Sequence, residues 1–174
     1  MTALYVITKI LTFPGALTRG FWEQVVCRCS KVPVEDNRYL RRDEMASHIE
    51  HELMPKARGA FAIGFVPFFF QLFGALIIGS IPFASVLYYE FKGDAVYTIV
   101  MALGCWLSAS LLCNLFPLVE DMLNMTEKVY KHGNILQKIF YTPGIAILYV
   151  GAYLEKYCVT FLAVVVGIIV MLVG

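Results

Sequence analysis

Long stretches without ionisable side chains dominate the hydrophobic pattern of the chain. Residues 59–89 contain no Asp, Glu, Lys, Arg or His, and residues 95–119 form a second stretch of this kind. A helix needs about 20 predominantly apolar residues to cross a bilayer, so each stretch is long enough to do so. The pattern therefore predicts membrane-spanning helices in the middle of the chain.

Each end of the chain carries a further apolar region with few interruptions. Residues 1–18 contain only Lys9 as an ionisable residue, and residues 145–174 contain only the adjacent pair Glu155 and Lys156. We interpret Lys9 as a side chain that reaches along its helix to the membrane surface. We interpret the acidic–basic pair as an interface before the last span. The four regions predict an all-α, polytopic membrane helical bundle of about four transmembrane helices, in a single domain.

Two polar segments separate the apolar regions, at residues 19–58 and 120–144. Both carry several lysines or arginines, whereas the short connection at residues 90–94 carries only Lys92. Lysine and arginine mark the cytoplasmic side of a membrane protein. We therefore predict that both polar segments are cytoplasmic and that both termini lie on the non-cytoplasmic side.

Composition agrees with a membrane protein and excludes other classes. Of the 174 residues, 59% are hydrophobic and 16% are charged, against about 45–50% and 25% in soluble domains. The net charge of +1 gives no field that would recruit nucleic acid. The five cysteines are an odd number and do not predict a disulfide framework. The expected surroundings are the lipid bilayer, with no nucleic-acid partner.

A Pro-Gly break opens the most informative segment, TFPGALTRGFWEQ at residues 12–24. Arg19 and Glu23 are four positions apart and so share one face of a helix. The segment resembles the zincin-like integral membrane proteins related to site-2 type zinc intramembrane metalloproteases. In that family a Phe-Pro-Gly stretch runs into a His-Glu-x-x-His helix, whose two histidines bind zinc and whose Glu is the general base.

Two other segments extend the resemblance. The sequence NLFPLVED, at residues 114–121, resembles the family's Asn-x-x-Pro…Asp segment, whose Asp is the third zinc ligand. This match places Asp121 at a ligand position and implies a substrate-holding groove near Asn114. The residues alone favour Asn114 as an amide that bonds between helices, which is the usual use of such a residue in a helical bundle. His51-Glu52 resembles a dipeptide of other members.

The zinc site that the resemblance implies is degenerate in this chain. Arg19 stands at the first metal histidine, Gly20 at the general base and Glu23 at the second histidine. A guanidinium has no lone pair to offer a metal, and glycine has no side chain to take a proton. We therefore predict no catalytic residues, no zinc or other cofactor, and a pseudoprotease that binds a transmembrane helix or a partner protein.

A hypothesis for the lost metal is an ion cluster of Arg19, Glu23 and Asp121. An uncompensated charge at membrane depth is expensive, so an arginine would take the place of the dication. The alternative is a solvated pair of Arg19 and Glu23 at the membrane surface, which contributes little. Gln71, an amide within an apolar run, is predicted to bond across helices and to face the Arg19 region.

Two other functions stay open at this point. His48 and His51 are three apart and would share a helical face. Together with Asp121 they would form a relocated zinc site of an active metalloprotease. In the other reading the chain is a small structural or assembly subunit of a membrane complex, and Gln71 and Asn114 merely bond to each other.

Overall fold

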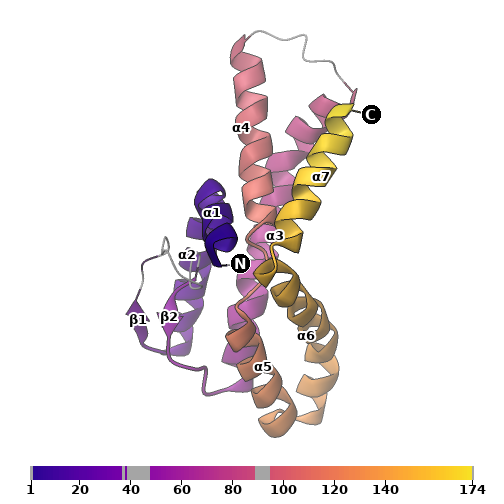
Figure 1. Cartoon of the computed structure of the whole chain (residues 1–174). Helices are drawn as coiled ribbons and strands as arrows, with labels where there is room; N and C mark the ends of the chain where they lie inside the picture. Colours follow the sequence, from indigo (N-terminus) through magenta and orange to yellow (C-terminus); the bar gives the residue numbers. More distant parts are fainter. Residues whose placement is uncertain (1, 37, 39–47, 89–94, 174) are drawn as a thin grey trace.

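The computed structural model describes residues 2–36, 38, 48–88 and 95–173, which form seven helices and one two-stranded antiparallel ladder (Figure 1). The predicted connection at residues 90–94 lies outside this part. The all-α prediction is confirmed, and three of the helices are long and apolar enough to cross a membrane: α3, α4 and α6. The elements are α1 (Thr2–Leu11), α2 (Phe13–Ser30), β1 (Val34–Asp36), β2 (Glu50–His51), α3 (Ala57–Tyr88), α4 (Ala95–Leu112), α5 (Val119–His132), α6 (Ile135–Lys156) and α7 (Val159–Val173).

Helix α3 is the axis on which the other helices pack. It has 32 residues and continues through Pro67 and Pro82. At 1.5 Å per residue it is about 48 Å long, well beyond the roughly 30 Å of a bilayer's hydrocarbon core. A single helix therefore takes up residues 59–88 of the predicted apolar stretch, and its two halves have different neighbours.

The C-terminal half of α3 packs against α4 and α7, which we call the upper layer. Ser108 of α4 donates a hydrogen bond of 2.8 Å to the carbonyl of Ala75. The N-terminal half of α3 packs against α2, α5 and α6, which we call the lower layer. There, the rings of Phe61 and Tyr141 of α6 stack with their centroids 4.1 Å apart. Figure 1 shows the two layers above and below the middle of α3.

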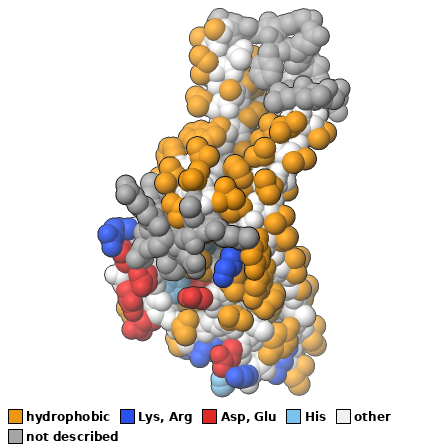
Figure 2. All heavy atoms as spheres, viewed as in Figure 1, with side chains coloured by type: hydrophobic (Ala, Val, Ile, Leu, Met, Phe, Trp, Pro, Cys, Tyr) orange, Lys and Arg blue, Asp and Glu red, His pale blue; other side chains and the backbone are white. Residues whose placement is uncertain are grey.

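The main buried hydrophobic cluster belongs to the lower layer, together with the chain around β1 and β2. Many apolar side chains of the upper layer face outward, as does one side of α6 in the lower layer. In Figure 2 hydrophobic side chains cover the upper part of the molecule, and charged ones gather in its lower half. The cluster consists of Val26, Cys27, Val32, Ile49, Met54, Ala57, Ala60, Ile63, Met122, Met125, Val129, Ile145, Leu148 and Ala152.

Three chain breaks lie where the layers meet. Helix α1 ends before Thr12, residues 113–118 separate α4 from α5, and Cys158 separates α6 from α7 with a left-handed backbone (φ 59°). The predicted first span, residues 1–18, is wrong, because α1 has 10 residues and reaches only about 15 Å. The break at Thr12 comes too early for that region to cross as one helix.

Gly15 permits the closest crossing of two helices next to these breaks. A Cβ on Gly15 would lie 2.6 Å from the carbonyl carbon of Ser110 and 2.8 Å from Nδ2 of Asn114. Both groups belong to α4 or its end, so the backbones of α2 and α4 approach here without room for a methyl group.

We predict that Gly15→Ala lowers the free energy of unfolding by about 1–3 kcal/mol, because the methyl group forces the two backbones apart. The matched control is Gly167→Ala on α7, where nothing lies within 4 Å of the added Cβ. The control is expected to be neutral or slightly stabilising, since alanine is the better helix former. Unfolding in detergent measures both variants, and equal effects would contradict the assigned crossing.

Candidate functional site

Polar side chains of α3 and α4 hold the break between α1 and α2. Ser110 donates to the carbonyl of Thr12 at 2.7 Å, and its hydroxyl oxygen accepts the N–H of Gly15 at 2.7 Å. Gln71 donates to the carbonyl of Gly15 at 2.6 Å and accepts from the hydroxyl of Thr18 at 3.2 Å. The bond to Ser110 satisfies the N–H of Gly15, a first-turn group without a helical partner, and the other bonds add to carbonyls at the break.

Asn114 lies at the centre of the same region and is completely buried. Its Nδ2 donates to the hydroxyl of Thr12 at 3.0 Å and to the carbonyl of Ser110 at 2.8 Å. Its Oδ1 accepts from Nζ of Lys9 at 3.0 Å. The amide thus bonds between helices, as one of the two alternatives predicted. Gln71 also bonds across helices, as predicted, and its partners on α2 are Gly15 and Thr18, the latter next to Arg19 in the chain.

An ion pair between Lys9 and Glu155 links α1 to the end of α6. The two side chains are 1% and 5% exposed. Lys9 also donates to the carbonyl of Cys113 at 3.3 Å. The other carboxylate oxygen of Glu155 accepts the N–H of Phe116 at 2.8 Å. The pair therefore bonds to the irregular connection between α4 and α5 at two points, Cys113 and Phe116.

This ion pair overturns the interpretation of Lys9, which does not reach for the membrane surface. Glu155 is buried against Lys9, but a helix does end at the predicted place, because α6 stops at Lys156. One signal in the sequence pointed to the pairing. Each is an isolated or nearly isolated ionisable residue in a terminal apolar region, and the two have opposite charges, as buried charges require. Lys156, next to Glu155 in the sequence, is exposed and is not the partner of Glu155.

Arg19, at the first ligand position of the resemblance, is 0% exposed. Its Nε lies 2.9 Å from Oε1 of Glu23, and its Nη1 donates to the carbonyl of Leu115. Its Nη2 has no hydrogen-bond partner within the described residues. The pair is therefore buried and not solvated. Gly20, between the two charged residues, is also buried in α2.

Glu23 attaches the chain around β2 to α2. Its Oε1 lies 2.7 Å from Nδ1 of His48, and its Oε2 accepts the N–H of Ile49 at 3.2 Å. Burial alone would raise the pKa of Glu23, but the adjacent His48 and Arg19 outweigh this effect and lower the pKa to about 2. The carboxylate stays charged at neutral pH and serves three partners at once.

Asp121, at the first turn of α5, has His51 as its ion-pair partner at 3.5 Å. Burial raises the pKa of Asp121 to about 6, and the charge interaction with His51 offsets only part of this effect. The hypothesised three-residue cluster is therefore incorrect as a set of direct contacts. Glu23 pairs with Nε of Arg19, whereas Asp121 pairs with His51 of β2.

The structure separates the two histidines of the alternative metal site. His48 and His51 lie in and beside a strand and not on a helix, so the predicted common helical face is wrong. Each contacts a different carboxylate, Glu23 or Asp121. Among the described residues, no three His, Cys, Asp or Glu side chains come together as a group that could hold a metal ion.

Comparisons of the chain with protein-family models, with curated proteins and with solved structures give no match.

We predict that Lys9→Met and Glu155→Gln each lower the free energy of unfolding by about 3–5 kcal/mol, because each leaves a buried charge unpaired. The double variant Lys9→Met/Glu155→Gln is expected to cost less than the sum of the two single changes. The control is the exposed pair of Lys131 and Glu127, whose atoms are 2.9 Å apart and whose loss changes stability by at most about 1 kcal/mol. A double-mutant cycle in detergent measures the coupling, and additive effects would contradict the pair.

We predict a pH dependence that depends on Asp121. A folded-state pKa of about 6, above the ordinary 3.8, means that the folded chain binds this proton more tightly than the unfolded chain does. The resulting stability is complete below pH 3.8 and is lost as the pH rises through 6. Asp121→Asn removes this loss, so the melting temperature of the variant gains on that of the native protein between pH 5 and about 7.5. Parallel melting curves over this range would contradict the assignment.

Proposed function

We propose that the chain is a catalytically inactive, membrane-embedded protein that resembles zincin-type proteases and acts by binding. It would hold a transmembrane helix or a partner protein without cleaving it. The observation that carries this proposal is the buried pair of Arg19 and Glu23. A guanidinium fills the position at which the resembling family keeps a metal histidine, and it is bonded on two sides.

The chemistry left at this place supports binding over hydrolysis. A catalytic zinc needs three protein ligands and an open position for water. Arg19 cannot be a ligand, Gly20 has no group that could act as a base, and Glu23 is engaged by Arg19 and His48. The two carboxylates at this site serve as anchors for neighbouring elements.

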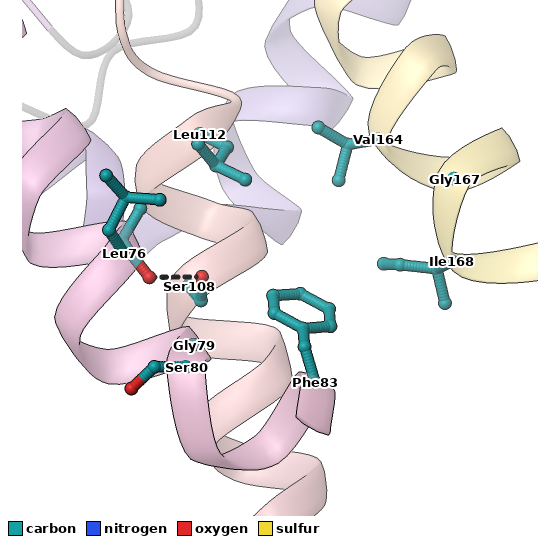
Figure 3. A pocket seen from close by; sticks show the side chains of 10 residues that line it. Leu76, Gly79, Ser80, Phe83, Ser108, Leu112, Val164, Gly167 and Ile168 are labelled. Carbon is teal, nitrogen blue, oxygen red and sulfur yellow. Dashed lines mark hydrogen bonds between the residues drawn. The ribbon is translucent and has the colours of Figure 1, made fainter. Parts of the chain in front are cut away.

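A cavity of about 410 Å³ between α3, α4 and α7 is the place where an apolar guest fits (Figure 3). Its two serine hydroxyls are already used, because Ser80 bonds to the carbonyl of Ile77 and Ser108 to that of Ala75. A guest therefore meets an apolar wall, as side chains of a transmembrane helix would require. The cavity is lined by Ala75, Leu76, Gly79, Ser80, Phe83, Ser108, Leu112, Val164, Gly167 and Ile168.

The orientation in the membrane belongs to the same proposal. The described basic residues of segments 19–58 and 120–144 belong to α2, the start of α3, α5, α6 or the chain near β1 and β2. Positively charged segments stay in the cytoplasm. We place the lower layer on the cytoplasmic side. The prediction that both termini lie on the other side stays a prediction.

A second candidate function is a small structural or assembly subunit of a membrane complex. It is favoured by the use of Gln71 and Asn114, whose amides both serve the break between α1 and α2. Neither amide offers its side chain to a substrate in an open groove. The two amides do not bond to each other, which corrects that part of the alternative.

The decisive test is zinc analysis of the purified native protein beside the variant Arg19→His/Gly20→Glu/Glu23→His. We expect no stoichiometric zinc in the native protein and one zinc per chain in the variant, because the two imidazoles would join Asp121 as ligands. The control adds Asp121→Ala to the variant and is expected to lose the metal.

Two results would contradict the proposal. Stoichiometric zinc in the native protein that disappears on replacing His48 and His51 by Ala would favour the relocated metalloprotease. A folded triple variant that takes up no zinc would show that the three positions do not correspond to the ligand positions of the family.

A further inference from the structure

Helices α4 and α6 lie beside opposite ends of α3. Gly104 of α4 faces Pro82, with 2.6 Å between an added Cβ and the ring Cγ, and Gly144 of α6 faces Phe61 at 3.1 Å. Pro82 and Phe61 are 21 residues apart (82 − 61), or about 31 Å along the helix. Even a tilt of about 40° leaves roughly 24 Å of this offset along the membrane normal. One bilayer cannot be centred on both helices.

The upper layer is the one that fits the bilayer. Helices α4 and α7 contain no ionisable residue, whereas α5 carries six and α6 carries three. Lys156 and Tyr157, exposed between α6 and α7, are residues of the kind that mark a membrane interface. Helix α6, although apolar enough to cross, therefore projects from the membrane together with α5.

The outward face of α6 is a continuous apolar surface, which we call the α6 face. At 100° per residue its nine members fall within an arc of about 140°, and each is exposed to solvent. Their exposure reaches 76% at Ile135 and 75% at Phe140. Both lysines of the helix lie outside the arc. The α6 face consists of Ile135, Leu136, Ile139, Phe140, Pro143, Ala146, Ile147, Val150 and Leu154.

We propose that the α6 face is covered by the α6 face of a second copy of this chain. Outside the bilayer no lipid tail covers it, and a large apolar surface in water marks a protein contact. Two copies inserted in one bilayer and related by a twofold axis along its normal present this helix in parallel. The face carries no charge, so identical faces meet without repulsion.

The spacing of the apolar residues fits a helix as the occupant. Leu136, Phe140, Pro143, Ile147, Val150 and Leu154 follow one another at intervals of four, three, four, three and four. Such spacing places a seam along one side of a helix, the pattern by which parallel helices pack. The contact arises from α6 and not from the cavity between α3, α4 and α7.

A nitroxide on Ile147→Cys, in purified protein reconstituted into lipid vesicles, tests the contact. Cys29 and Cys105 are replaced by Ser in this background, because they are the cysteines that are not buried. We expect low accessibility to both oxygen and a water-soluble nickel chelate, together with spin–spin broadening that weakens on dilution with unlabelled protein. The matched label, Val166→Cys on α7, is 56% exposed and is expected to be accessible to oxygen.

The other outcomes at Ile147 overturn the proposal. High oxygen and low nickel accessibility means that lipid covers the face, and high nickel accessibility means that nothing does. Low accessibility without broadening means that the face is covered by its own chain. Adding Phe140→Glu is expected to abolish the broadening, whereas Gln137→Glu, outside the arc on the same helix, keeps it. If Phe140→Glu loses helical signal in circular dichroism, the milder variant Ile139→Gln is measured in its place. Ile139→Gln is expected to weaken the spin–spin broadening.

Discussion

The structure depends on satisfying a backbone that leaves helical geometry inside a largely apolar molecule. Unpaired carbonyl and amide groups cost several kcal/mol each in a medium without water. Residues 113–118 run irregularly between α4 and α5, and three charged side chains bond to them. Lys9 and Arg19 donate to carbonyls, and Glu155 accepts an N–H. These charges are expensive to bury singly, but each of the three side chains has an ion-pair partner and a backbone bond.

The same physical requirement explains where the polar residues of the apolar helices lie. Gln71, Ser110 and Asn114 all point at the chain between Thr12 and Gly15, and the indole of Trp106 adds a bond to the carbonyl of Leu11. A break in α1–α2 without these groups would leave first-turn and last-turn backbone atoms unpaired. The small volume of glycine at position 15 lets α4 come near enough to supply them. Sequence features that suggested a protease site thus have a structural use.

Much of the architecture could be predicted from the sequence, because apolar runs identify membrane helices by length alone. Residues 59–89 gave α3 almost to its ends, and residues 95–119 gave α4. The contacts of the candidate site are harder to predict from the sequence, because contacts between distant charges depend on how the helices cross. The pairing of Lys9 with Glu155 joins residues 146 positions apart, and no periodicity encodes it. His48 and His51 were misplaced for a different reason: a three-residue spacing indicates a common face only if the segment is a helix, and here it is extended.

The buried charged groups largely compensate one another within the described part of the chain. Lys9 and Arg19 supply two positive charges, and Glu155 and Glu23 supply two negative ones. Asp121 is the fifth charge, and it is the one whose pKa burial raises to about 6. Its carboxyl can therefore become neutral with little change in pH, whereas Glu23 stays ionised. A dication at this place would need at least two carboxylates free of other partners. Glu23 is bonded to both Arg19 and His48, so its charge is compensated within the chain. The bonds of this network hold α2 to the neighbouring elements.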